Sequence, residues 1–415
     1  MNIYDITPGG APGWLAYKGS SDGTAVVVES TAATEVQSKT VATCKVDTGK
    51  FAIVYVTGSG ATGVVRLAIC TVSGTTITIG TPIEVSANST QKGVSVVALS
   101  TSKIVVGWRD HGGTDPQGQT ISSYTISGTT PTLDATLLIN NTQSTSTDPH
   151  FSVHLISSTR VFCHYWDGTN KRVVGVTVGS GSLTKDGTSL ILKSGAGANL
   201  AAVVATAAMA GSFVISSTRI LTYYSTATSG NTCCMILSDN DGTALGEAGF
   251  GAAIRIDTGL GARNKLHIRS MNPGTDTIFL VGSSDGKFGY MKRTGDIIEL
   301  HTIGAEVGGL RLGFSYNLGA LEATTGGFTA PVIDILSSIS PDSASENQMS
   351  VRGAFFSTAD YGLACLSQGY SGRLSIKAAE ESVQARSDIL SLSAGLAIVA
   401  YPSTSNYINV KAISL

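Results

Sequence analysis

A short polar phrase that recurs at a fixed spacing is the feature that most constrains how this chain can fold. Ile-Ser-Ser-Thr-Arg occupies residues 156–160 and recurs unchanged at 215–219, and a looser copy, Leu-Ser-Thr-Ser-Lys, occupies 99–103. A hydrophobic run precedes and follows each copy, so each phrase is typical of a hairpin turn between two strands. Self-similarity at a fixed period indicates a repeat architecture, in which each copy of the period contributes one structural unit.

A second repeated phrase marks another hairpin in the same unit. Val-Ser-Gly-Thr-Thr at 72–76 matches Ile-Ser-Gly-Thr-Thr at 126–130, and strand-like segments lie on both sides of each. One period therefore holds four antiparallel strands, which is the blade of a β-propeller, with blades slightly longer than the usual length of about 40–50 residues. We predict an all-β chain of β-propeller type. A β-sandwich or an array of β-solenoid units is the alternative fold.

The spacing of the second strands predicts the number of blades. These strands begin near residues 51, 103, 160, 219 and 277, and the last begins near residue 395, two periods further on. We therefore expect seven blades, of which the sixth, at about 305–386, is irregular and its strands cannot be ordered from the sequence. Residues 24–29 resemble a fourth strand, and we expect this N-terminal strand to complete the C-terminal blade. Such closure would protect an otherwise open sheet edge.

Two segments do not fit the repeat. Residues 1–20 precede the first strand of the ring and contain Pro-Gly-Gly-Ala-Pro-Gly, so we expect an N-terminal anchoring segment there and the propeller over residues 21–415. The Ala-rich segment 199–210 lies between the third and fourth blades. Its composition is compatible with a helix of about three turns and equally with a lengthened inner strand.

The composition excludes several classes of partner. Only 13% of the residues are charged and the formal net charge is −2, so no basic surface is present for nucleic acid. No apolar stretch reaches the length of about 18 residues that a membrane span requires. The first residues lack the pattern of a signal peptide, and the six cysteines show no regular spacing, which predicts buried free thiols and folding in a cytoplasm.

A search for catalytic and metal-binding motifs gives little. His150 and His154 are four residues apart on a predicted strand, a separation of roughly 13 Å that is too long for joint ligation of one ion. The Asp-Gly turns resemble the Asp-boxes of sialidases only faintly, and Asp-Gly is also a favoured hairpin turn. We therefore predict no catalytic residue, no metal site, no cofactor and no enzymatic activity. The sequence leaves open a pair of carboxylates formed between blades, as a glycan-cleaving enzyme would need.

Aromatic residues near the ends of the second strands are the candidate binding site. Those strand ends emerge on one face of a propeller, and polar residues follow several of them. Aromatic rings with hydrogen-bonding neighbours could hold sugar rings there, whereas the alternative is that these rings pack between adjacent blades. The candidate residues are Tyr55, Trp108, Arg109, Trp166, Asp167, Tyr223 and Tyr224.

The repeated phrases also resemble those of a known class of proteins. Leu-Ser-Thr-Ser-Lys-Ile-Val-Val-Gly-Trp at 99–108 and Val-Ser-Gly-Thr-Thr-Ile-Thr-Ile-Gly-Thr-Pro-Ile-Glu-Val at 72–85 are similar to phrases in β-propeller virion proteins of tailed bacteriophages. The resemblance covers residues 41–300. It implies a non-enzymatic tail, fibre or decoration component that is assembled in the host cytoplasm into a homo-oligomer or larger assembly. It further implies contacts to other virion proteins through residues 1–20 and to a host surface glycan. The alternatives are a bacterial carbohydrate-binding propeller and a glycan-cleaving propeller enzyme.

Overall fold

The structure is a computed structural model. It describes the backbone of residues 23–30, 41–57, 63–86, 91–110, 118–141, 151–167 and 169–193, and from residue 210 to 414 it describes the strands and Tyr407. Between residues 210 and 389 only the backbone of those strands is described. The predicted anchoring segment at 1–20 and residues 199–209 of the Ala-rich segment lie outside the described residues, and Ala210 is the first residue of a strand.

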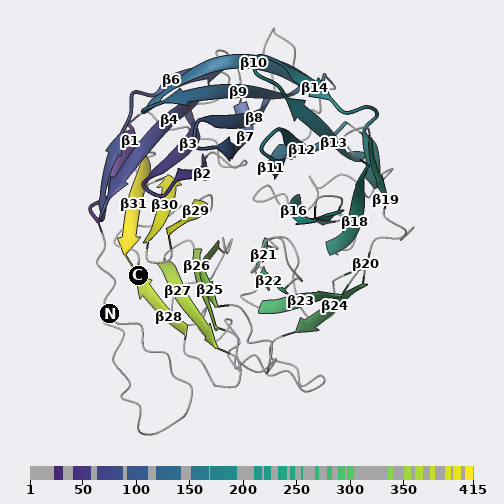
Figure 1. Cartoon of the computed structure of the whole chain (residues 1–415). Coiled ribbons are helices and arrows are strands. Elements are labelled where there is room, and N and C mark those ends of the chain that lie inside the picture. Colours follow the sequence, from purple (N-terminus) through teal and green to yellow (C-terminus); the bar gives the residue numbers. More distant parts are fainter. Residues whose placement is uncertain are drawn as a thin grey trace, which may run out of the picture.

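The described strands form antiparallel sheets of four strands, three of which carry a short fifth strand. Figure 1 shows the sheets following one another around a common centre. The first three sheets in chain order are β2 (Val41–Asp47), β3 (Lys50–Thr57), β4 (Val64–Ser73), β5 (Thr76–Ile79) and β6 (Ile83–Ser86); β7 (Gln91–Ser100), β8 (Lys103–Asp110), β9 (Gln119–Ser127) and β10 (Thr130–Asn140); and β11 (Phe151–Ser157), β12 (Arg160–Trp166), β13 (Lys171–Val178), β14 (Leu183–Lys185) and β15 (Leu190–Lys193).

The next three sheets repeat this order. They are β16 (Ala210–Ser216), β17 (Arg219–Ser225), β18 (Thr232–Asn240), β19 (Ala244–Glu247) and β20 (Ile254–Arg255); β21 (His267–Ser270), β22 (Ile278–Gly282), β23 (Phe288–Thr294) and β24 (Ile297–Thr302); and β25 (Asp334–Ile339), β26 (Ser350–Phe356), β27 (Asp360–Ser367) and β28 (Leu374–Ala378). In the region that the sequence could not order, the first strand of the sheet is Asp334–Ile339, which the sequence analysis missed.

The last sheet combines the two ends of the described chain. It has the order β1-β31-β30-β29, from β1 (Val26–Glu29), β31 (Ile408–Ser414), β30 (Leu396–Pro402) and β29 (Asp388–Ser393). Val26 pairs with Val410 in an antiparallel ladder, and β1 lies at the edge of this sheet. Figure 1 shows β1 beside β31, next to the sheet that contains β2 and β3.

The repeated phrases occupy the turns that the sequence assigned to them. Thr159 and Ser158 form the turn between β11 and β12, and the backbone N–H of Thr159 donates to Ser157 Oγ at 3.3 Å. In the second type of turn, Gly74 and Gly128 have φ angles of 57° and 62°. This left-handed conformation is readily open to glycine, because a Cβ atom would be strained there.

The hydrophobic core lies between neighbouring sheets rather than inside any one of them. One cluster joins Tyr55 and Phe51 of the first sheet to Ile398 of the last, and a second joins Val54 of the first sheet to Trp108 of the second. A third cluster joins the second sheet to the third, and there Gly107 lies so close to β11 that an added Cβ would meet Val153 Cγ2 at 2.5 Å.

In the second and third sheets, the basic residue that ends the repeated phrase clamps the outer part of its own sheet. Nε and Nη2 of Arg160 donate to Asp186 Oδ2 at 2.8 and 2.7 Å, and Thr177 Oγ1 donates to Asp186 Oδ1 at 2.6 Å. In the second sheet Lys103 takes the same position, with Nζ 3.6 Å from Oδ2 of Asp134, and it also donates to the carbonyl oxygen of Gly179 at 2.5 Å. In these two sheets the phrase therefore supplies both a turn and a cation. Within the part of the chain that is described, no helix has the length and apolarity of a membrane span.

Candidate functional site

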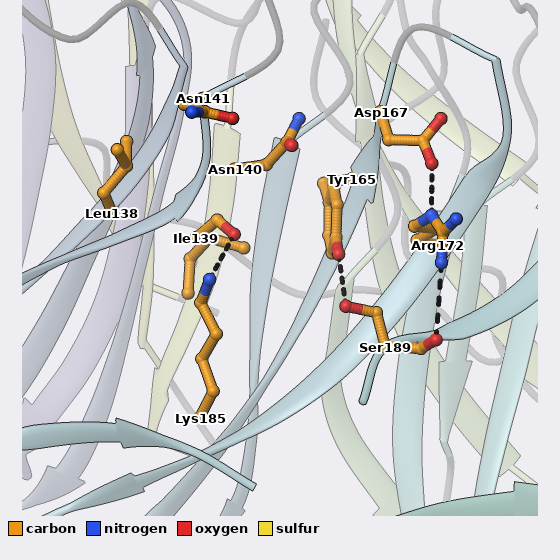
Figure 2. Close-up of a pocket in the computed structure, with 9 residues that line it drawn as sticks. All are labelled: Leu138, Ile139, Asn140, Asn141, Tyr165, Asp167, Arg172, Lys185 and Ser189. Atoms are coloured by element: carbon orange, nitrogen blue, oxygen red, sulfur yellow. Dashed lines mark hydrogen bonds and ion pairs between the residues drawn. The ribbon is translucent and has the colours of Figure 1, made fainter. Parts of the chain in front are cut away.

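A groove of about 500 Å³ lies between the second and third sheets. It opens near the end of β10 and beside the turn between β12 and β13, which is the end of the blades opposite the repeated Ser-Ser-Thr phrases. Figure 2 shows the residues that line it: Leu138, Ile139, Asn140, Asn141, Tyr165, Asp167, Arg172, Lys185 and Ser189.

Tyr165 forms the aromatic part of the groove. Strand β12 places it opposite Phe151 on one side and Arg172 on the other, and its ring belongs to the core cluster between the two sheets. Its side chain is 4% exposed, and its hydroxyl forms a hydrogen bond of 2.5 Å with Ser189 Oγ. Burial raises the pKa of this hydroxyl, so Tyr165 is a neutral phenol that can donate and accept hydrogen bonds.

Asp167 is held as a carboxylate at the mouth of the groove. Its Oδ1 accepts hydrogen bonds from the backbone N–H groups of Thr169 at 2.9 Å and Asn170 at 2.6 Å, and its Oδ2 accepts one from Arg172 Nε. Burial alone would raise the pKa of Asp167, but the hydrogen bond from Arg172 and the two backbone N–H donors outweigh it and lower the pKa to about 2. The carboxylate and the guanidinium therefore offset one another's charge.

Amide and ammonium groups complete the lining. Asn140 Nδ2 donates to Gln119 Oε1 at 2.9 Å, which fixes the amide at the end of β10. Asn141 is exposed beside it. Lys185 Nζ donates to the carbonyl oxygen of Ile139 at 2.7 Å and so ties the third sheet to the second.

Of the seven candidate residues predicted from the sequence, Asp167 lines this groove. Tyr55, Trp108 and Arg109 are buried, with exposures of 0%, 5% and 2%. Tyr55 and Trp108 belong to core clusters between sheets, which favours the packing alternative for these two rings. Trp166 lies at the end of β12, and Tyr223 and Tyr224 lie in β17. The side chains of these last three lie outside the described residues.

The analysis missed Tyr165, although the repeat contains a signal for it. Trp108 and Tyr224 each lie five residues after the cation of their repeated phrase, and the same count from Arg160 reaches Tyr165 and not Trp166. The strand pairing agrees, because Trp108 and Tyr165 lie opposite residues near the beginnings of β9 and β13. Arg172 and the asparagines of the groove carry no comparable sequence pattern.

The chemistry of the groove is that of binding by hydrogen bonds. Among the described residues, Asp167 is the one carboxylate that lines the groove, and no group of three His, Cys, Asp or Glu side chains in that part of the chain is arranged to hold a metal ion. The buried Cys70 and Cys163 are free thiols, and burial raises the pKa of Cys70 to about 12.

Comparisons with known proteins identify the fold. No protein-family model matches the chain, and no curated protein sequence is significantly similar to it. Among solved structures, it is similar to the β-propeller domain of Cps50 (Swd1) from Myceliophteria thermophila, with a TM-score of 0.50 and 10% identity over 96% of this chain and 100% of that one. The chain thus has a β-propeller-like all-β fold.

Two further solved structures are similar at lower TM-scores. They are the polysaccharide lyase Uly1, with a TM-score of 0.49 and 9% identity over 95% of this chain and 99% of that one, and the Aleuria aurantia lectin in complex with alpha-methyl-L-fucoside, with a TM-score of 0.43 and 13% identity over 82% of this chain and 94% of that one.

Proposed function

We propose that this chain is a non-enzymatic binding propeller that recognises a glycan in the groove between the second and third sheets. The observation that carries the proposal is the convergence of Tyr165, the Asp167–Arg172 pair and the asparagine amides on one opening. A sugar presents many hydroxyl groups that both donate and accept hydrogen bonds, together with apolar C–H faces. A neutral phenol, a fixed carboxylate and fixed amide donors are complementary to that pattern.

The ionisation of Asp167 supports binding without turnover. Glycoside hydrolysis uses two carboxyl groups about 5–10 Å apart, one of which must be protonated to act as an acid. In the groove Asp167 has no carboxylate partner among the lining residues, and its pKa of about 2 leaves it ionised at neutral pH. It can therefore accept hydrogen bonds from hydroxyl groups but has no proton to give.

The proposed frame for this site is a closed ring of seven blades. The pairing of β1 with β31 and the core cluster that joins the first sheet to the last support this arrangement. A closed ring would hold neighbouring sheets, and so the two walls of each groove, at a fixed separation.

We also place this binding activity on a phage particle, as a host-attachment or decoration component held through residues 1–20. Support comes from the sequence resemblance and from the buried free thiols Cys70 and Cys163, which suit assembly in a reducing cytoplasm. Mass spectrometry of purified particles and binding of the purified chain to host cells test this placement. A chain found outside the particles would refute it.

A glycan array probed with the purified chain tests the binding function. Asn141→Ala removes an exposed amide from the groove and should weaken binding about 5- to 10-fold, the usual effect of one lost hydrogen bond. Asp167→Asn should weaken it further, because it also disturbs Arg172. Ser102→Ala, an exposed polar change at the opposite end of the same sheet, is the matched control and should bind like the wild type. An array without a bound glycan, or equal binding by Asn141→Ala and wild type, would contradict the proposal.

A further inference from the structure

A second junction between sheets repeats the central pair of the groove. In the groove, Tyr165 of β12 lies opposite Arg172 of β13. Where the last sheet meets the first, Tyr55 of β3 lies opposite Arg66 of β4. Both tyrosines lie five residues after the basic residue that begins their strand, Lys50 or Arg160, so the two pairs occupy equivalent positions in their sheets.

In both places the outer strand of the preceding sheet contributes a third residue to the site. In the groove this residue is Asn140, which follows a β-bulge at the end of β10. At the second junction it is Glu29, which follows a β-bulge at the end of β1. Oε2 of Glu29 lies 3.9 Å from Nε of Arg66, so the carboxylate and the guanidinium meet across the two sheets, as Asp167 and Arg172 meet within one.

The second junction has an exposed rim above a buried ring. The side chain of Arg66 is 37% exposed and that of Glu29 is 17% exposed, whereas Tyr55 is 0% exposed. Burial raises the pKa of the Tyr55 hydroxyl, the charge of Glu29 raises it further, and the charge of Arg66 opposes this. The hydroxyl therefore lies within electrostatic reach of both rim groups, below them, as Tyr165 lies below the groove.

Two polar atoms at this junction have no hydrogen-bond partner among the described residues. They are the hydroxyl of Tyr55 and Nε of Arg66. In the groove, the equivalent hydroxyl is bound to Ser189 Oγ. Ser189 directly precedes β15, the fifth strand of the third sheet. The fifth strand of the first sheet is β6, and the residue that directly precedes it is Pro82. The side chain of Pro82 has no group that could form the equivalent hydrogen bond. Buried polar groups are nearly always hydrogen-bonded, so an unsatisfied hydroxyl and an unsatisfied guanidinium nitrogen on two residues that pair across one ladder indicate a place for an external partner.

The charges indicate which partner fits. At each junction the guanidinium already has a carboxylate beside it, so neither guanidinium is left unpaired for an anion, and the Lys185 ammonium of the groove donates to the carbonyl oxygen of Ile139. The groups that remain are a phenol hydroxyl, guanidinium N–H donors and carboxylate acceptors, which suit neutral hydroxyl groups. At the intervening junction, between the first and second sheets, the equivalent pair is Trp108 opposite Thr120, so a tyrosine and an arginine do not occupy these two positions.

We infer that the junction formed by Glu29, Tyr55 and Arg66 is a second binding site for a neutral sugar, related by the repeat to the groove between the second and third sheets. The inference rests on the proposed glycan-binding function and adds that each chain is bivalent. Two linked sites raise avidity for a surface coated with glycan far above the affinity of either site, provided that both can be engaged together.

Titration calorimetry of the full chain with monovalent methyl α-glycosides of galactose, glucose, mannose, fucose and N-acetylglucosamine tests the inference. For a glycoside that binds, the wild type should take two equivalents. Arg172→Met and Arg66→Met should each take one, and the double variant should take none. Tyr55→Phe should weaken the second site about 5- to 10-fold without lowering the thermal midpoint, because it removes a hydroxyl that has no partner in the fold.

The controls separate the second site from the proposed function. Tyr124→Phe alters another buried tyrosine, 2% exposed and on β9, and should leave binding at both sites unchanged. A wild type that takes one equivalent, lost in Arg172→Met, would overturn the second site and leave the groove standing. A Tyr55→Phe variant that binds two equivalents with unchanged affinities would also overturn it. A wild type that binds none of the glycosides would overturn both proposals.

Discussion

Replacement of Asp186 by alanine tests the idea that the cation of the repeated phrase clamps the outer part of the blade. The carboxylate accepts two hydrogen bonds from Arg160, at 2.8 and 2.7 Å, and one from Thr177 at 2.6 Å. The Asp186 side chain is 3% exposed and that of Arg160 is 11% exposed. Removal of one partner of such a buried pair leaves the other charge unpaired and costs about 3–5 kcal/mol.

The assay is urea unfolding followed by tryptophan fluorescence and far-UV circular dichroism. Asp186→Ala should lower the free energy of unfolding by about 3–5 kcal/mol, because the Arg160 guanidinium is left almost without solvent. The double variant Arg160→Met/Asp186→Ala should lose much less than the sum of the two single variants, since the second change removes the stranded charge.

The second sheet provides a matched control. Asp134 occupies the same position there and accepts a hydrogen bond from Thr125 Oγ1 at 2.9 Å, but its side chain is 12% exposed, its oxygen lies 3.6 Å from Lys103 Nζ, and Lys103 Nζ donates instead to the carbonyl oxygen of Gly179 at 2.5 Å. A looser and more exposed pair contributes about 0–1 kcal/mol, so Asp134→Ala should destabilise the fold clearly less than Asp186→Ala. Equal losses for the two variants, or losses that simply add in the double variant, would refute the clamp.

Three further predictions follow from burial and charge. Gly107→Ala should destabilise the fold by about 1–3 kcal/mol in the same unfolding assay, because the new Cβ would overlap Val153, and an unchanged midpoint would contradict the packing of the second sheet on the third. The pKa of Asp167 is lowered to about 2. The contribution of this carboxylate to stability should therefore be complete above about pH 4 and should be lost as the pH falls towards 2. Unfolding midpoints measured from pH 5 to pH 2 should show this loss in the wild type, and Asp167→Asn should remove it. Iodoacetamide labelling with peptide mapping at pH 8 should modify Cys44 well before Cys70, whose thiol is buried and has its pKa raised to about 12, and equal labelling would refute that burial.

The repeat predicts the fold well where each blade has a turn phrase. The phrase at 156–160 placed β11 and β12, and the phrase at 126–130 placed β9 and β10. Between residues 305 and 386 no copy of either phrase is present. Without a turn phrase the strands there could not be ordered from the sequence, and the structure gives their order as β25-β26-β27-β28.

The groove was harder to predict than the fold. Asp167 stood out because a carboxylate follows an aromatic strand end. Tyr165 did not, because Trp166 is the larger ring next to it, and only the count of five residues from Arg160 distinguishes the two. Asn140 and Ser189 reach the groove only because two sheets pack side by side, and no periodicity within one blade contains that information.

The ladder between β1 and β31 also bears on the order in which the strands of the fold can pair. Val26 and Val410 lie far apart in the sequence, so during synthesis on the ribosome β1 emerges well before β31 and has no ladder partner until β31 has been made. The entropy of bringing the two strands together rises only slowly with the length between them, by about 2 kcal/mol when that length increases from one blade to the whole chain. The pairing therefore costs little extra free energy at equilibrium, but it can form only after the strands between β1 and β31 have been made. We expect the pairing of β1 with β31 to be the last step of folding.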